Sequence, residues 1–136
     1  ENISVSLASG EEFGTMYEFK DMLDNGKVDI VQPDMSRCGG ITMAKKIADM
    51  AQLRGKKLIP HAFKTGILIG ATLQLIAAIP NADMLEYCAQ ETVLSKNLVK
   101  HHFTLDRDGN VTIPDLPGIG VELNEEILNK YRRNGR

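Results

Sequence analysis

Four polar residues recur at nearly even spacing along this chain, and each stands where an apolar run gives way to a loop. The four are Glu11, Asp34, His61 and Glu86, at intervals of 23, 27 and 25 residues. A strand, a loop and a covering helix together take about 25–30 residues, so this period predicts repeated βα units. In a parallel βα barrel the catalytic groups follow the carboxyl ends of successive strands. The spacing therefore predicts that these four side chains form one wall of an active site.

The apolar runs predict four short parallel strands, at residues 3–8, 28–32, 57–60 and 84–87. We expect the first strand to be buried on both faces, as parallel strands usually are. Helices should lie between the strands, because apolar residues recur there with a helical period. The first should open with the capping box of Thr15 and Glu18 and the second after the pair Gly39 and Gly40, while the third carries an apolar stripe from Leu68 to Ile79. Their predicted ends are Gly26, Gly55 and Pro80.

Beyond Cys88 the pattern changes. A turn signal at 106–109 precedes a brief predicted strand at 111–113, and a last helix should begin at Asn124. An eight-unit barrel takes about 250 residues, whereas this chain has 136 and begins at Glu1 without a methionine. We therefore expect the C-terminal portion of a larger enzyme, produced by truncation or proteolysis.

Composition excludes several classes of function. A net charge of −2 with interspersed signs argues against nucleic-acid binding, which needs a basic face. The longest apolar stretch, residues 67–80, is shorter than the ~20 residues that span a bilayer, and the start shows no secretory leader. Cys38 and Cys88 are the only cysteines, and their spacing fits no zinc motif. We expect reduced thiols in a cytoplasmic protein.

The four recurring residues have chemistry that suits a catalytic wall. Glu11 follows Gly10 and offers a carboxylate to a hard cation such as Mg²⁺, although a solvated loop acid is the common alternative. Asp34 and His61 should lie on adjacent strands about 4.8 Å apart, within hydrogen-bonding reach. An aspartate that orients one imidazole nitrogen leaves the other free as a general base or acid. The alternatives are a turn residue at Asp34 and a structural histidine at His61.

Glu86 ends the last predicted strand between Leu85 and Tyr87. These apolar neighbours favour a protonated carboxyl, which could donate a hydrogen bond to a developing oxyanion. A strand-end acid paired with a basic residue is the alternative. We interpret His101 and His102 as surface residues.

Five runs of the sequence carry a family resemblance, in this order: LASGEEF, VDIVQPDMSRCGGIT, LIPHAFKTGI, IPNADMLEY and DGNVTIPDLPGIGVELNEEIL. They resemble the C-terminal part of the mandelate racemase/muconate lactonizing enzyme family, in the mandelate racemase branch of the enolase superfamily. The resemblance implies an α/β fold in which residues 1–100 form the C-terminal half of a (β/α) TIM-type barrel. Residues 101–136 would be a tail that packs toward a capping domain.

The resemblance also implies a role for each of the four residues. Glu11 resembles a carboxylate ligand of an essential Mg²⁺. Asp34 and His61 resemble a dyad whose histidine exchanges a proton with the substrate. Glu86 resembles the acid that hydrogen-bonds the substrate carboxylate as it becomes an enediolate. The other two metal ligands, and usually a lysine acid/base, belong to strands that this sequence lacks.

The activity implied is Mg²⁺-dependent removal of the proton alpha to a carboxylate. Dehydration of a sugar acid, an aldonate or aldarate, is favoured over racemisation or epimerisation of a 2-hydroxy acid. A non-catalytic half-barrel that serves as an interaction module is the alternative from another class. A phosphate-binding barrel is disfavoured, because it needs glycine-rich loops after both of the last strands. We expect a small carboxylate substrate and a homo-oligomer, with neither nucleic acid nor membrane as a partner.

Overall fold

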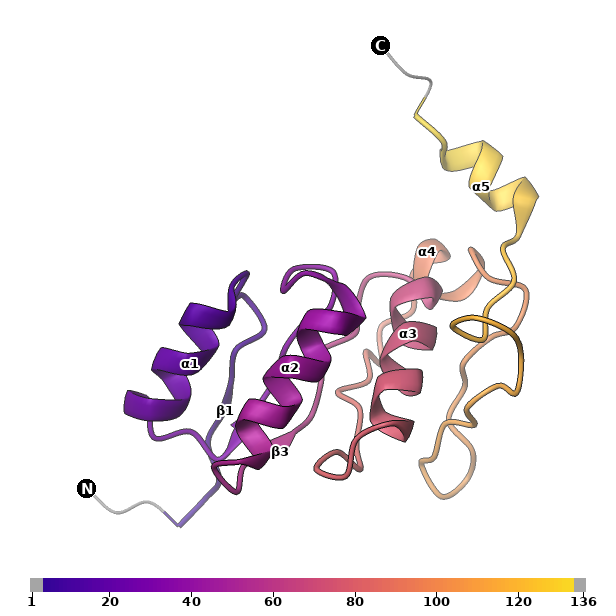
Figure 1. The fold of residues 1–136 in the computed structure, drawn as a ribbon. Coiled ribbons are helices and arrows are strands. Elements are labelled where there is room, and N and C mark those ends of the chain that lie inside the picture. Colours follow the sequence, from indigo (N-terminus) through magenta and orange to yellow (C-terminus); the bar gives the residue numbers. More distant parts are fainter. Residues whose placement is uncertain (1–3, 134–136) are drawn as a thin grey trace.

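The computed structural model describes residues 4–133 as consecutive βα units around a small parallel sheet. The sheet has the order β1-β2-β3, and its strands are Ala8–Ser9, Ile30–Val31 and Lys57–Leu58. Ala8 pairs with Ile30, which pairs with Lys57, and both pairings are parallel. The helices α1, α2 and α3 run side by side along one face of this sheet (Figure 1). The predicted α/β class with a parallel sheet is confirmed.

The first two helices form where local signals placed them. Helix α1 (Met16–Asn25) is capped by Thr15, whose side chain and that of Glu18 form the predicted capping box. Helix α2 (Gly40–Gln52) follows Gly39, whose φ of 99° is a left-handed conformation that favours glycine. The inner faces of both helices carry the apolar residues that cover the sheet. These buried residues are Phe19, Met22, Leu23, Ala44, Ile47, Ala48 and Ala51.

Helix α3 (Gly66–Ala77) is covered on several sides. Its residues Gly66 and Gly70 let other side chains approach closely, because a Cβ on Gly66 would lie 2.5 Å from Val99 Cγ2 and one on Gly70 would lie 2.5 Å from Val121 Cγ1. Both valines belong to the segment after Cys88. The tail therefore packs on α3, and the core continues from the sheet through α3 into this segment.

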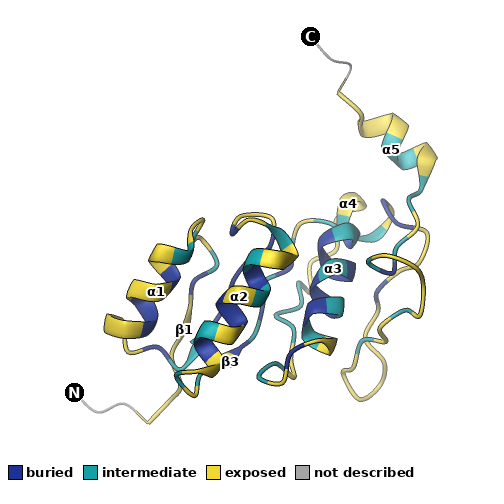
Figure 2. Ribbon diagram, in the orientation of Figure 1, coloured by how far each residue is buried: buried dark blue, intermediate teal, exposed yellow. Residues whose placement is uncertain are grey.

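The strands are shorter than predicted, and the first is also more exposed. Residues 4–9 are exposed (Figure 2), so the prediction of a first strand buried on both faces was wrong. The helices cover one face of the sheet, and β1 also lies at its edge with a neighbouring strand on one side only, so the strand is not enclosed. Ile3, the first residue of that predicted strand, lies outside the described residues.

The predicted strand at 84–87 was also wrong as a strand, since it reduces to one parallel bridge between His61 and Glu86. In that bridge the Glu86 N–H donates to the carbonyl of Pro60, 3.2 Å away. Proline has no N–H to donate, so Pro60 interrupts the ladder that a full strand would need.

The final segment is built mostly of turns. Helix α4 (Val93–Lys96), which the sequence did not predict, is capped by Thr92. The predicted turn at Asp106 is present, while the predicted strand at 111–113 is reduced to a bridge between Leu105 and Val111. Helix α5 (Glu125–Tyr131) begins after Asn124 as predicted and projects away from the rest of the chain (Figure 1). No helix in residues 4–133 is long and apolar enough to cross a membrane.

Candidate functional site

Asp34 and His61 lie in contact at the carboxyl ends of neighbouring strands. Asp34 follows β2 and His61 follows β3, and the backbone N–H of His61 donates to the carbonyl of Pro33. His61 Nδ1 is 3.1 Å from Asp34 Oδ2. The Asp34 side chain is fully buried and that of His61 is 12% exposed. Sequence spacing predicted this pair, and the structure brings it together.

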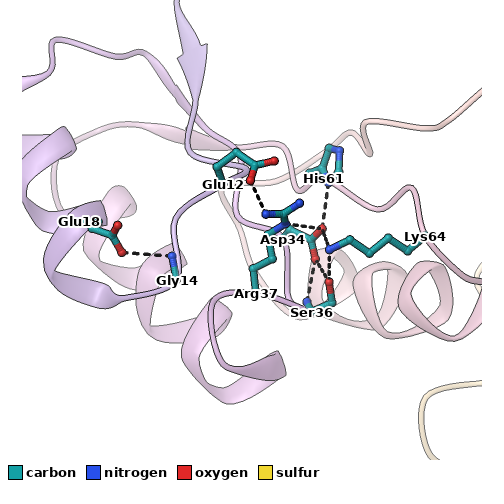
Figure 3. A network of polar contacts seen from close by, with 8 residues as sticks. All are labelled: Glu12, Gly14, Glu18, Asp34, Ser36, Arg37, His61 and Lys64. Atoms are coloured by element: carbon teal, nitrogen blue, oxygen red, sulfur yellow. Dashed lines mark hydrogen bonds and ion pairs between the residues drawn. The ribbon is translucent and has the colours of Figure 1, made fainter.

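His61 is not the only group that contacts the Asp34 carboxylate. Its Oδ1 accepts from the backbone N–H and the hydroxyl of Ser36, at 2.7 and 2.6 Å. Its Oδ2 accepts from Lys64 Nζ at 2.9 Å as well as facing the imidazole. Arg37 Nε lies 4.0 Å from the same oxygen and Arg37 also pairs with Glu12. Figure 3 shows these side chains directed at the one carboxylate.

This network keeps Asp34 charged. Burial is the largest influence on the pKa of Asp34 and by itself raises it, but the hydrogen bonds from Ser36, Lys64 and His61 together hold the pKa below its usual value. A charged carboxylate can accept a hydrogen bond from a protonated Nδ1 of the imidazole. That orientation leaves the other ring nitrogen, Nε2, as the position for an exchangeable proton.

The His61 ring also has an apolar support. It stacks on Phe63, with ring centroids 4.2 Å apart and planes 27° from parallel. One edge of the imidazole is therefore fixed by a carboxylate and one face by an aromatic ring. A side chain held in this way can present Nε2 in one direction.

Glu86 lies next to His61 along the backbone bridge, but its carboxylate interacts with another residue. Gln32 Nε2 donates to Glu86 Oε2 at 2.7 Å, so a side chain from the end of β2 reaches across β3 to Glu86. The structure thus places Glu86 beside the dyad without a hydrogen bond between them. Gln32, Ser36 and Lys64 are polar contacts of the site that sequence reasoning missed. Only Ser36 had a readable signal, because Asp-x-Ser is a common side-chain-capped turn.

Glu11 follows β1 and stands apart from the other three predicted residues. It is half-buried at the edge of an open hollow of about 300 Å³, which Ser9, Gly10 and Gln32 also line. Gln32 borders this hollow and also donates to Glu86. The four predicted residues therefore lie along the carboxyl ends of the strands, with Gln32 between Glu11 and Glu86.

The oxygen donors near Glu11 decide whether this part of the chain fits a magnesium ion. Mg²⁺ requires a near-octahedral shell of oxygens. Within residues 4–133 no three His, Cys, Asp or Glu side chains gather closely enough to hold a metal ion. The Glu11 carboxylate beside an open hollow fits one ligand of such an ion, and the described residues do not complete the set.

Comparison with known proteins identifies the family of this chain. A family model described as "Enolase C-terminal domain-like" matches residues 1–127. D-galactarolactone cycloisomerase of Agrobacterium fabrum is 34% identical over 94% of this chain and 36% of its own length. Arabinonate dehydratase of Saccharolobus solfataricus is 32% identical over 97% of this chain and 35% of its own. D-galactonate dehydratase of Variovorax paradoxus is 34% identical over 96% of this chain and 36% of its own. The chain thus spans about a third of the length of these curated relatives.

Solved structures give the same assignment. A member of the enolase superfamily from Polaromonas sp. JS666 superposes with a TM-score of 0.85 and 39% identity, covering 95% of this chain and 34% of that one. A mandelate racemase/muconate lactonizing enzyme from Jannaschia sp. CCS1 gives a TM-score of 0.84 and 36% identity, covering 98% of this chain and 34% of that one. The chain therefore belongs to the enolase C-terminal domain-like family, as the C-terminal part of the mandelate racemase/muconate lactonizing enzymes.

Proposed function

We propose that this chain carries the base of an enzyme that removes the proton alpha to the carboxylate of a sugar acid and then expels a hydroxyl group. The observation that carries the proposal is the 3.1 Å contact between His61 Nδ1 and the buried, charged Asp34. The names of the relatives support the substrate class, because two of them are dehydratases of arabinonate and galactonate.

The proposed reaction starts at His61. Nε2 takes the alpha proton, and the electrons of that C–H bond move into the carboxylate to give an enediolate. The imidazolium that results is stabilised by Asp34 through Nδ1. The enediolate then collapses, the bond from the beta carbon to its hydroxyl breaks, and the hydroxyl takes a proton from His61 as it leaves. The products are water and an enol, which tautomerises to a 2-keto acid.

Glu86 is proposed to act on the carboxylate of the substrate. Charge accumulates on that group as the enediolate forms, so a hydrogen-bond donor there would stabilise the transition state more than the ground state. The bond from Gln32 orients the Glu86 carboxyl group. For this role Glu86 must carry a proton while the substrate is bound.

Magnesium is proposed as the cofactor, with Glu11 contributing one ligand. The bound cation would supply positive charge beside the substrate carboxylate. The remaining ligands would come from outside residues 4–133, because no set of three donors is present within them.

The parallel sheet of this chain is proposed to be part of a (β/α) barrel, with residues 1–100 as its C-terminal half and residues 101–136 as a tail toward a capping domain. Three consecutive parallel strands with helices on one face support the proposal, as does the greater length of the relatives. On this view the 136-residue chain is inactive alone, and the full enzyme is a homo-oligomer.

The proposal is tested by an activity screen. The full-length protein, purified with Mg²⁺, is incubated with a panel of aldonates and aldarates, and 2-keto acid formation is followed. We expect at least one acid sugar to be dehydrated and the His61→Asn variant to be inactive on it. Turnover that persists in His61→Asn would overturn the assignment of the base.

Isomerisation is the second candidate function, since one relative is named a cycloisomerase and solved neighbours are named for mandelate racemase. Removal of an alpha proton would begin a racemisation or epimerisation in the same way. The screen separates the two, because an isomerase returns a product of unchanged mass whereas a dehydratase loses water. A half-barrel that serves only as an interaction module would give no turnover with any of these acids.

A further inference from the structure

Lys64 lies in the loop between β3 and α3, and its side chain contacts Asp34 of the dyad. Its Nζ lies 2.9 Å from Asp34 Oδ2 and 2.5 Å from Ser36 Oγ. Oδ2 is also the atom that faces His61 Nδ1. An ammonium group and an imidazole therefore share one carboxylate oxygen (Figure 3).

We propose that Lys64 is a positioning residue that sets the pH range in which His61 acts as a base. The inference rests on the proposed function of the dyad. Lys64 neutralises part of the charge on Asp34, so Asp34 stabilises a protonated His61 less than an unpaired carboxylate would. Without Lys64 the carboxylate would attract that proton more strongly, and His61 would remain protonated to higher pH.

Burial makes this interaction stronger than an ordinary surface pair. The Asp34 side chain is fully buried and that of Lys64 is 42% exposed. Lys45 and Asp49 on α2 also form a lysine–aspartate ion pair, but their side chains are 44% and 51% exposed. Charges that are both exposed are screened by water and interact weakly, whereas a buried carboxylate responds to each neighbouring charge.

The other charged groups around the dyad do not replace Lys64. Arg37 is at 4.0 Å from Oδ2 and its guanidinium also pairs with Glu12. Glu86 adjoins His61 through the backbone and accepts its hydrogen bond from Gln32. The Cys38 thiol stays neutral, because burial, with a smaller contribution from the Asp34 charge, raises its pKa to about 11. Among residues 4–133, Lys64 is the basic side chain closest to the Asp34 carboxylate, at 2.9 Å against 3.1 Å for His61 and 4.0 Å for Arg37.

The alternative role for Lys64 is purely structural, as a brace that links two loops. It joins the loop after β3 to the loop after β2 through Asp34 and Ser36. A brace would change stability or turnover at every pH alike. A charge effect would change the pH dependence, so the two roles differ in a measurable way.

The experiment compares Lys64→Met and Lys64→Gln with the matched control Lys45→Met, all in the full-length protein. Two readouts are recorded from about pH 5 to 9, across the range where histidines titrate. The first is the pH profile of kcat/KM with the acid sugar found in the screen. The second is the proton NMR titration of the His61 ring, whose signal is identified among the histidine signals by its loss in His61→Asn. The NMR readout needs no substrate.

Both Lys64 variants should move the His61 titration midpoint and the acid limb of the rate profile upward by about one pH unit. The value of kcat/KM should then fall about tenfold on the acid side and stay nearly constant on the plateau. Lys45→Met should match the wild type, and Lys64→Arg should restore the wild-type profile. Midpoints in folded Lys64→Met and Lys64→Gln that coincide with those of Lys45→Met would overturn the proposal. If His61→Asn keeps full turnover, the proposed function fails while the NMR titration still decides the role of Lys64.

Discussion

Asp34 combines complete burial with negative charge, and its hydrogen bonds make this possible. Ser36 supplies two donors to one oxygen, and Lys64 and His61 share the other. A buried carboxylate without such partners would be costly, and it would take up a proton instead. The same arrangement orients the histidine, so one set of contacts stabilises the fold and prepares the site.

Acid should weaken the fold through Asp34. Because the pKa of Asp34 is held below its unfolded value of 3.8, its contribution to stability is present above that pH and is lost as the pH falls through the folded value. Denaturant unfolding of the wild type and of Asp34→Asn should be compared between about pH 6 and 3. The two free energies of unfolding should converge on the acid side. A difference that is independent of pH would contradict this account of the carboxylate.

The two cysteines should differ in reactivity. Cys38 is 1% exposed, and burial raises its pKa to about 11, whereas Cys88 is partly exposed. At pH 8 the raised pKa alone reduces the thiolate fraction of Cys38 by about 100-fold relative to an ordinary thiol. Alkylation of the native protein should therefore label Cys88 first, and both residues should react in denaturant. Mass spectrometry that finds equal labelling rates in the native protein would show that Cys38 is accessible.

Among the elements, the helices were predicted better than the strands. The capping box at Thr15 and the buried stripe from Ala44 to Ala51 are local signals, which a sequence carries by itself. Strand length depends on partners, and here Pro60 interrupts pairing with the segment that contains Glu86. Helix α4 was missed because Ser95 stands at the third helical position where the usual capping box has Glu or Gln.

In the candidate site, too, some features could be predicted from the sequence and others depend on contacts that the sequence does not specify. Contact between Asp34 and His61 could be predicted, because both residues end neighbouring parallel strands and the pairing of strands sets their distance. Gln32 and Lys64 could not be predicted, since long flexible side chains can reach several partners and sequence spacing does not choose among them. The position of Glu11, half-buried beside an open hollow, could not be predicted either, because the sequence indicates the end of a strand but not what lies across from it.

Helix α3 should be sensitive to a single added methyl group. A Cβ on Gly70 would lie 2.5 Å from Val121 Cγ1 and 3.0 Å from the carbonyl of Ile119. Glycine to alanine normally stabilises a helix by up to about 1 kcal/mol, so a loss in Gly70→Ala would report the clash. We expect Gly70→Ala to lose about 1–3 kcal/mol in denaturant unfolding.

The double variant Gly70→Ala/Val121→Ala is the control for this contact. Removing the valine methyls should recover part of the lost stability, because the close Cγ1 atom is gone. A single variant as stable as the wild type would show that the tail does not pack on α3 as described.

At the scale of the whole molecule, the sheet is open. Val5 and Leu7 beside β1 are 68% and 42% exposed, and Met84 beyond β3 is 54% exposed. Unpaired strand edges and exposed apolar side chains favour association with other chains. The isolated 136-residue chain should therefore form oligomers whose mass grows with concentration in light scattering. Calorimetry should detect no tight Mg²⁺ binding, because Glu11 is a single ligand. A monodisperse monomer with micromolar affinity for Mg²⁺ would contradict both the open barrel and the shared metal site.

The central claim is that His61, oriented by Asp34, exchanges a proton with the carbon alpha to a carboxylate. Deuterium transfer tests it most directly. The full-length protein is incubated in water with the acid sugar that it consumes, deuterated at the alpha carbon, and release of that deuterium to the solvent is measured by NMR. The wild type should release the deuterium, His61→Asn should release none, and Asp34→Asn should be slower by about 10²–10⁴-fold while keeping its fold. Release by His61→Asn at the wild-type rate would contradict the account.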